Sequence, residues 1–304
     1  MLNAIKHKCS LALLIIIFIF ICCKTTFTNN ESILGYNFGK PDKTTVLPDT
    51  LHEISGITNI DSTTFACIQD ENGIIFFYDV KKNYIKRQLK FNIDGDYEGI
   101  TRVGNNMYIL RSDGTLFEIL NFNSNNFSLN SYSTGIPANN NEGLCYDEAN
   151  KRLLIACKSK VGNGHDFKDK RAIFGFDLKT KRLTSIPVFD FDLQKIKDFA
   201  TKNNIKITSK KHKKKAKHKT EPDIKFKPSA ICIHPLSNNL YLLSATDYLL
   251  FIFDMKGNIQ HIEKLNPALF NKAEGITFYE NGDLLITNEG QNKKPTVLLF
   301  KYRK

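Results

Sequence analysis

The chain has 304 residues, of which 41% are hydrophobic, and a formal net charge of +12. This length and composition allow a large buried core in one or two domains. Seven lysines lie within residues 209–219, and without them the net charge is +5, so a nucleic-acid-binding surface spread over the protein is not expected.

The N-terminal segment has the pattern of an export signal. Two lysines precede eleven consecutive apolar residues, 11–21, a run that is shorter than the roughly 20 residues of a membrane-spanning helix. Cys22 and Cys23 follow, as in lipoprotein signals, which end with a cysteine that becomes lipidated. We predict a signal peptide or membrane anchor over residues 1–23, lipidated at Cys22 or Cys23; an uncleaved anchor and an ordinary cleaved signal remain the alternatives. Each alternative predicts an exported protein at the cell membrane or in the periplasm.

Residues 24–45 are predicted to form a tether, and from Val46 the chain repeats one short phrase. Its five copies are EISGIT (53–58), DYEGIT (96–101), NNEGLC (140–145), KPSAIC (227–232) and KAEGIT (272–277). Successive copies are 43, 44, 87 and 45 residues apart. A period of about 40 to 50 residues with several strands in each unit indicates a β-propeller.

Each unit predicts four strands: the phrase opens the first, two apolar runs supply the second and third, and a weaker run supplies the fourth. The long interval holds an insertion, residues 193–226, with a short helix and a lysine-rich tip. Five blades are therefore predicted, and a sixth, degenerate blade is the alternative. The last unit ends after its third strand, so residues 44–48 are expected to complete it and close the ring. The predicted fold class is all-β, a single propeller around a central channel over residues 46–304.

The cysteines lack the spacing of a zinc site or a disulfide framework. Cys145 and Cys232 occupy the column that holds threonine in the other copies of the phrase, which is typical of a small, half-buried strand position. We expect buried free thiols at Cys67, Cys145, Cys157 and Cys232.

Several phrases occur together in the order found in one family. LPDTLHEISGI, CIQDENGIIFFYD, DYEGI, NNEGLCYD and KAEGITFYENGDLLITNEG together resemble the SdiA-regulated domain family of bacterial β-propellers. The resemblance covers about residues 46–304 and implies a membrane-associated envelope protein. It implies no defined biochemical activity, and it does not account for the lysine-rich insertion.

One column of the phrase is expected to form a ring, because the start of the innermost strand of each blade lies beside the channel. The ring consists of Ser55, Glu98, Glu142, Ser229 and Glu274. Facing carboxylates repel one another and raise their own pKa values unless a cation is present. Ca²⁺ suits such an oxygen-rich site, and the ends of the second strands add Asp70 and Glu289 as candidate metal ligands.

Two other interpretations of the ring remain. The glutamates can bond backbone amides of the neighbouring blade and so lock blade to blade without a metal, or they can act directly in catalysis. Arg111, at the end of the second strand of blade two, is a candidate to neutralise the ring, and Glu53 is a secondary candidate member.

The sequence contains no GxSxG, HExxH or P-loop motif. We therefore predict a membrane-anchored envelope propeller that acts as a binding or interaction module, with a calcium-type cation as its candidate cofactor. The alternative is a metal-dependent hydrolase of phosphate esters or lactones, in which Glu98, Glu142 and Glu274 hold the metal. Anionic lipid or an envelope polymer is the candidate partner of the lysine-rich loop, through Lys210, Lys211, Lys213, Lys214 and Lys215.

Overall fold

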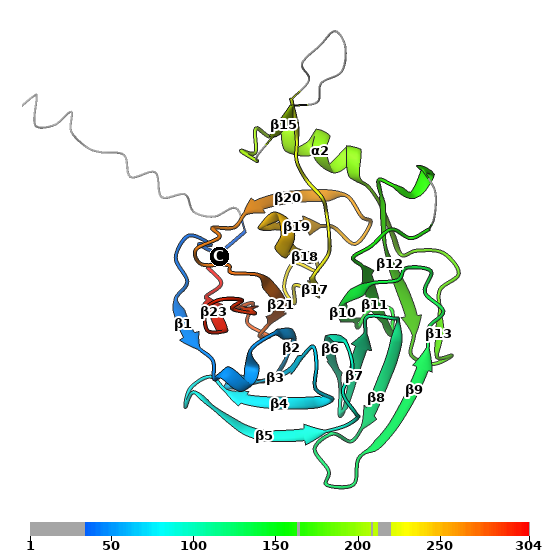
Figure 1. Ribbon diagram of the computed structural model, residues 1–304, viewed down its shortest axis with the longest axis vertical. Coiled ribbons are helices and arrows are strands. Elements are labelled where there is room, and N and C mark those ends of the chain that lie inside the picture. The colour runs from blue at the N-terminus through cyan, green and yellow to red at the C-terminus, as the bar shows by residue number, and fades with distance from the viewer. Residues whose placement is uncertain (1–33, 163–164, 208, 212–219, 304) are drawn as a thin grey trace, which may run out of the picture. The chain divides into compact units, whose positions relative to one another are not determined.

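The computed structural model describes residues 34–162, 165–207, 209–211 and 220–303. The predicted signal over residues 1–23 lies outside this range, as do Lys213, Lys214 and Lys215. The chain divides into two compact units, Met1–Tyr36 and Asn37–Lys304, and all the described strands belong to the second. That unit is a five-bladed β-propeller, which confirms the predicted fold class (Figure 1).

Each blade is an antiparallel sheet whose strands follow one another outward from the channel (Figure 1). Blade 1 consists of β2 (Ile54–Asp61), β3 (Thr64–Gln69), β4 (Ile74–Asp79) and β5 (Tyr84–Lys90). Blade 2 consists of β6 (Tyr97–Val103), β7 (Asn106–Arg111), β8 (Thr115–Leu120) and β9 (Ser128–Ser133). Blade 3 consists of β10 (Asn141–Asp147), β11 (Arg152–Cys157), β12 (Lys170–Asp177), β13 (Arg182–Leu183) and β14 (Phe189–Asp192). Blade 4 consists of β17 (Ala230–Ile233), β18 (Leu240–Ser244), β19 (Leu249–Phe253) and β20 (Ile259–Lys264).

Blade 5 joins strands from opposite ends of the unit. It consists of β21 (Ala273–Phe278), β22 (Leu284–Asn288), β23 (Thr296–Phe300) and β1 (Lys43–Val46). β1 pairs antiparallel with β23, with Val46 opposite Thr296, so the predicted closure by an N-terminal strand is confirmed. The pairing covers the edge of β23 that would otherwise be open to another chain.

The five first strands form the wall of the channel. β2 contacts β6, β6 contacts β10, β10 contacts β17, β17 contacts β21, and β21 contacts β2. Residues at the same position of these strands therefore meet around one axis.

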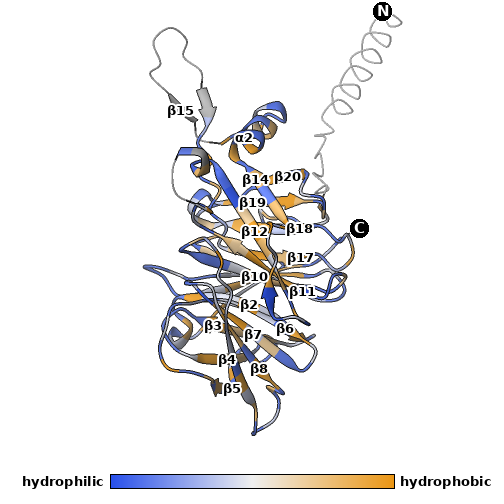
Figure 2. Cartoon of the chain, turned by 90° about the vertical axis from the view of Figure 1, so that its right-hand side faces the viewer, coloured by the Kyte–Doolittle hydropathy of each residue, from blue (hydrophilic) through white to orange (hydrophobic). Residues whose placement is uncertain are grey.

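Burial of the strands follows their order in the blade. All six residues of β3 and all five of β18 are buried, because neighbouring blades cover both faces of these strands. Exposure alternates along the outer strand β5, as expected where only one face is covered. Figure 2 shows hydrophobic residues, in orange, along the strands of the propeller. The four described cysteines, three of them buried and Cys232 partly exposed, are free thiols, as predicted.

Blade 3 has two short outer strands, whereas the sequence predicts a single fourth strand in each unit. β13 and β14 both pair with β12, and the chain between them contains Pro187. Proline has no amide hydrogen to donate to the sheet, so the strand is interrupted there.

The insertion after blade 3 begins with α2 (Leu193–Lys202), which packs through Leu193, Ile196 and Ala200. The side chain of Asp192 caps this helix by accepting a hydrogen bond from the backbone amide of Gln194 at 2.8 Å. The short strands β15 (Ser209–Lys211) and β16 (Thr220–Pro222) then pair antiparallel. Three 3₁₀ helices complete the described elements: η1 (Asp49–Leu51), η2 (His165–Phe167) and η3 (Ala245–Asp247).

Candidate functional site

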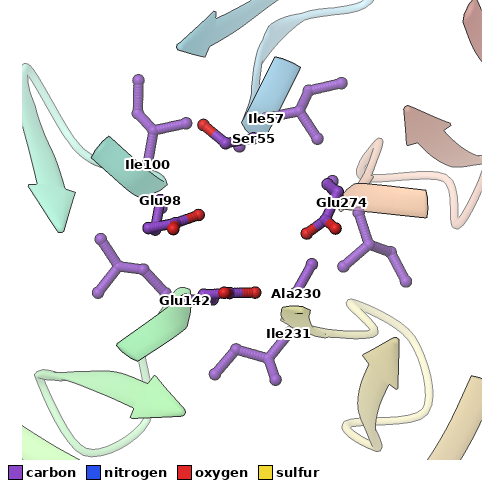
Figure 3. A pocket seen from close by; sticks show the side chains of 13 residues that line it. Ser55, Ile57, Glu98, Ile100, Glu142, Ala230, Ile231 and Glu274 are labelled. Carbon is purple, nitrogen blue, oxygen red and sulfur yellow. The ribbon is translucent and has the colours of Figure 1, made fainter. Parts of the chain in front are cut away.

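Four side chains of the predicted ring line one pocket at the channel mouth: Ser55, Glu98, Glu142 and Glu274. Ala230 takes the place of the fifth, Ser229. The cavity has a volume of about 10 Å³, which is room for about one water molecule, and Figure 3 shows the three carboxylates pointing toward its centre from three sides. The structure thus brings together the three glutamates that the repeat singled out.

A β-bulge turns each of these four side chains into the pocket. In blade 2, Tyr97 pairs with Arg111 and Gly99 pairs with Leu110, so Glu98 is the extra residue without a partner on β7. The same register shift falls at Ser55, Glu142 and Glu274. Bulges bend a strand and re-aim a side chain, and they are common beside functional sites.

Blade 4 departs from this pattern, and Ser229 lies outside the pocket lining. The residue before Ser229 is Pro228, which has no amide hydrogen and cannot form the pairing that precedes the bulge in the other blades. β17 therefore begins at Ala230, which pairs with Leu243. The hydroxyl of Ser229 donates to the carbonyl of Ala273 in blade 5 at 3.0 Å.

The glycine after each bulge residue is required by a close approach of neighbouring strands. A Cβ atom on Gly99 would lie 2.7 Å from Cβ of Leu144 and 2.9 Å from the carbonyl oxygen of Glu142. A Cβ atom on Gly275 would lie 2.7 Å from Cγ2 of Ile57. In the Glu-Gly pair of the repeat, the glutamate supplies a side chain to the pocket. The glycine, which has no side chain, lets the neighbouring strand approach closely.

Two positions after each ring residue, every blade has an aliphatic residue. These five residues form a second ring that lines the same pocket. It consists of Ile57, Ile100, Leu144, Ile231 and Ile276, all buried. We call this second ring the apolar floor. Its hydrocarbon side chains lower the dielectric constant around the carboxylates, which strengthens the repulsion between them.

Two lysines reach the carboxylates, and the sequence interpretation missed both. Lys158 forms an ion pair with Glu142. The ammonium of Lys272 lies 2.5 Å from Glu289 and 3.9 Å from Glu274. These lysines, and not Arg111, neutralise part of the ring; the guanidinium of Arg111 instead pairs with Asp113 at 2.7 Å.

The position of Lys158 belongs to a second column of the repeat, at the end of the second strand. The backbone amides of Asp70, Lys158 and Glu289 each donate to the carbonyl of the residue two positions before a ring residue. Asp70 and Glu289 therefore lie at the same end of their blades as the ring, but neither is among the residues that line the pocket. Aligning the ends of the second strands would have identified Lys158 with them.

Burial and mutual repulsion raise the pKa values of the carboxyl groups. Burial, with the charges of Glu142, Asp96 and Glu274, raises the pKa of Glu98 to about 9. The pKa of Glu274 is raised to about 8 by burial and by Glu142, against the effect of the two lysines. Burial also raises the pKa of Glu142, although Lys158 opposes this shift. Asp70 has a pKa of about 6, raised by burial and by the charges of Glu53 and Glu289.

The ring fits calcium poorly. Within the part of the chain that the structure describes, no three His, Cys, Asp or Glu side chains are placed to hold one metal ion. Glu142 and Glu289 already bind lysine ammonium groups, and the floor offers only aliphatic carbon. Ca²⁺ takes six to eight oxygen ligands, and the aliphatic side chains of the floor supply none.

No family model matches the chain, and no curated protein matches it. Among solved structures, the chain is similar to the glutaminyl cyclase of Myxococcus xanthus, with 12% identity and a TM-score of 0.54 over 86% of this chain and 95% of that one. A streptogramin B lyase structure aligns at 13% identity and a TM-score of 0.45, over 85% of this chain and 97% of that one. At such low identity the likeness to the cyclase supports the propeller fold alone. The resemblance to the SdiA-regulated domain family stays a prediction.

Proposed function

We propose that this protein is a binding module that holds a positively charged group of its ligand at the channel mouth. The observation that carries the proposal is the state of Glu142, whose side chain is only 3% exposed. One of its oxygens pairs with Lys158, whereas Oε2 is buried without a hydrogen-bond partner among the described residues. Leaving a buried acceptor unsatisfied costs about 1–3 kcal/mol, and a cationic ligand would remove this cost.

The charges around the pocket support the same conclusion. Five carboxylates surround two lysines, Lys158 and Lys272: they are Asp70, Glu98, Glu142, Glu274 and Glu289. The excess is negative, and the raised pKa values mean that Glu98 and Glu274 carry protons at neutral pH. A cation bound at this site would replace those protons.

We also propose that the module works in the cell envelope, anchored by residues 1–23 with lipidation at Cys22 or Cys23. This part of the proposal depends on the apolar N-terminal run and on the resemblance to the SdiA-regulated domain family. None of the described helices is both long enough and apolar enough to cross a bilayer. Contact of the lysine-rich loop with anionic lipid or an envelope polymer remains part of this proposal.

The alternative function, a metal-dependent hydrolase, needs Glu98, Glu142 and Glu274 to share one metal. The lysine pairing of Glu142 and the aliphatic floor argue against such a centre. We therefore base the proposal on binding.

Thermal unfolding tests the proposal. Purified, chelator-treated protein is heated with Ca²⁺, Mg²⁺, Mn²⁺ or an alkylammonium salt, beside a Glu98→Gln, Glu142→Gln double variant. Glu148→Gln is the control for the loss of a carboxylate away from the pocket, because Glu148 is exposed in the turn after β10. A cation that raises Tm of the parent and the control, but not of the double variant, supports a cation site at the mouth. If no cation does so, the proposal is wrong.

A further inference from the structure

The chemistry of the bound cation follows from the shape of the site. We propose that it is a primary ammonium group, R–NH₃⁺, which donates its three hydrogens to Glu98, Glu142 and Glu274 while its carbon stem points out of the channel. This inference rests on the proposed function and names the ligand class for that site.

The number and direction of the acceptors match this group. Figure 3 shows the carboxylates of Glu98, Glu142 and Glu274 approaching the centre from three sides. A primary ammonium has three N–H donors spread around its C–N axis and no acceptor. On the remaining sides, the hydroxyl of Ser55 is already bonded to the carbonyl of Tyr97 at 2.6 Å, and Ala230 presents a methyl group.

All three carboxylates have acceptor capacity to spare. Oε2 of Glu142 is buried and lacks a partner among the described residues. Glu274 is 5% exposed, and its nearest ion-pair contact in the described structure is the ammonium of Lys272 at 3.9 Å. No hydrogen bond or ion pair of Glu98 occurs within the described ranges. Each carboxylate can therefore accept one N–H without breaking an existing bond.

The apolar floor favours an ammonium group over a metal ion. A metal such as Ca²⁺ seeks oxygen ligands on all sides, and the ring of Ile57, Ile100, Leu144, Ile231 and Ile276 supplies none from below. An ammonium group whose stem points to solvent needs acceptors only on the side away from the stem. The bulged strands place the carboxylates of Glu98, Glu142 and Glu274 there.

The mouth already binds two ammonium groups of its own. Lys158 contacts Glu142, and Lys272 contacts Glu289. Carboxylates on this rim thus accept alkylammonium groups. Lys158 pairs with Glu142 and its charge also acts on Glu98 and Glu274, so an entering ammonium group would share the three carboxylates with Lys158.

Binding is expected to release protons. Glu98 is faced by Glu142 on β10, by Glu274 on β21, by Asp96 before its own strand and by Lys158 after β11. Glu274 is faced by Glu142, Glu289, Lys158 and Lys272. Because the carboxyls of Glu98 and Glu274 are protonated at neutral pH in the empty site, an entering cation displaces protons from them.

Calorimetric titration of the full-length protein with n-butylammonium chloride tests the inference. N,N,N-trimethylbutylammonium keeps the charge and stem but has no N–H donor, n-butanol keeps the stem without the charge, and CaCl₂ represents a metal. We expect n-butylammonium to bind the parent and Glu148→Gln, and to bind Glu142→Gln about tenfold or more weakly. The trimethyl compound is expected to bind the parent about tenfold or more weakly than n-butylammonium. Repeating the titration in buffers of different ionisation enthalpy should give net proton release that is smaller in Glu98→Gln.

The outcomes separate this inference from the proposed function. Equal binding of the trimethyl compound, or binding of Ca²⁺ without n-butylammonium, would overturn the ammonium assignment and leave a cation site standing. Failure of every cation to bind would overturn both. Circular dichroism spectra of the variants would show whether a lost affinity reflects lost folding, and Glu274→Gln provides a second variant if Glu142→Gln does not fold.

Two sources of the ammonium are then distinguished by a second pair of titrations. One uses 1,5-diaminopentane, a free amine, and the other a short peptide with a blocked N-terminus and one lysine. Tighter binding of the diamine assigns a free amine as ligand, and tighter binding of the peptide assigns a lysine side chain. Binding of neither would contradict the inference.

Discussion

Ser55 on β2 donates a 2.6 Å hydrogen bond from its hydroxyl to the backbone carbonyl of Tyr97, the residue before Glu98 in the next blade. Ser229 donates the equivalent bond to the carbonyl of Ala273, the residue before Glu274. One column of the repeat therefore has two roles. Its serines form hydrogen bonds to the backbone of the following blade, and its glutamates point their carboxylates into the pocket. Because each serine holds the backbone beside a glutamate, these bonds also position the site.

The tie at Ser55 predicts a stability effect. Replacing Ser55 by alanine leaves the buried carbonyl of Tyr97 without this donor, and we expect the free energy of unfolding to fall by about 1–3 kcal/mol. Urea denaturation measures the change, and Ser128→Ala, at an exposed position of β9, is the matched control with an expected effect near zero. Equal stability of Ser55→Ala and the parent would show that the bond does not hold the blades together.

The close approach at Gly99 predicts that a single methyl group is harmful. Gly99→Ala would place a Cβ atom 2.7 Å from Cβ of Leu144 and should lower the free energy of unfolding by about 1–3 kcal/mol, the usual cost of overpacking. Gly39→Ala is the control, because its Cβ would meet only the side-chain oxygen of Asn37 at 3.4 Å. Denaturant unfolding of both variants checks the prediction, and a stable Gly99→Ala protein would contradict it.

The raised pKa of Glu98 predicts how stability depends on pH. In the unfolded chain a glutamate loses its proton near its ordinary pKa of about 4.3, whereas Glu98 in the folded protein keeps it up to about 9. Between these values the folded state binds more protons than the unfolded state, so the free energy of unfolding falls as the pH rises. Above about pH 9 this contribution is constant.

Glu98→Gln cannot titrate, and we expect its stability to fall less steeply from pH 5 to pH 9 than that of the parent. Urea denaturation at several pH values measures the two slopes. Glu148→Gln should keep the slope of the parent. Identical slopes for Glu98→Gln and the parent would contradict the assignment of a protonated carboxyl to Glu98.

A second charged cluster, between blades 2 and 3, predicts the effect of losing a structural lysine. The ammonium of Lys181 lies 2.6 Å from Glu118 on β8 and 3.1 Å from the hydroxyl of Tyr108, and the hydroxyl of Tyr132 donates to Glu118 at 2.7 Å. Although burial alone would raise it, the pKa of Glu118 is lowered by these partners.

Lys181→Met should lower the free energy of unfolding at pH 7 by about 2 kcal/mol, less than the cost for a fully buried pair because Lys181 is 28% exposed. The pKa of Glu118 is lower in the folded than in the unfolded protein, so this contribution is present above the unfolded pKa and is lost as the pH falls through the folded one. The difference between variant and parent should shrink over the same range. Lys179→Met, at an exposed position of the same turn, is the control for denaturant unfolding at pH 7 and pH 4.

The fold and the three glutamates could be predicted because the repeat period equals one blade. A column of the phrase then recurs at the same place in successive blades, so Glu98, Glu142 and Glu274 were expected to converge near the axis once the propeller was recognised. The closing strand was predictable for a similar reason, since blade 5 lacks its outer strand in the C-terminal part of the sequence. These features depend on topology and need no knowledge of side-chain contacts.

The polar partners of the ring depend on local geometry that the phrase does not encode. Ser229 shares the column of the glutamates, yet its hydroxyl bonds the carbonyl of Ala273, and Ala230 lines the pocket in its place. The lysines reach the carboxylates across the rim from two different columns: Lys158 follows β11, and Lys272 precedes β21. A metal was expected because three carboxylates were counted without these two internal cations.

Replacing Lys158 gives the sharpest test of the channel mouth, because an added amine should take the place of the lost ammonium group and restore stability. Lys158→Ala removes the partner of Glu142 and leaves space where the lysine stem lay, so we expect a less stable protein at pH 7. Added n-butylammonium should restore part of that stability and raise Tm more in Lys158→Ala than in the parent, whereas N,N,N-trimethylbutylammonium, which has no N–H to donate, should not. Lys179→Ala controls for a general effect of the salt. Equal increments of Tm in Lys158→Ala, Lys179→Ala and the parent would mean that the rim does not recognise ammonium groups through its carboxylates.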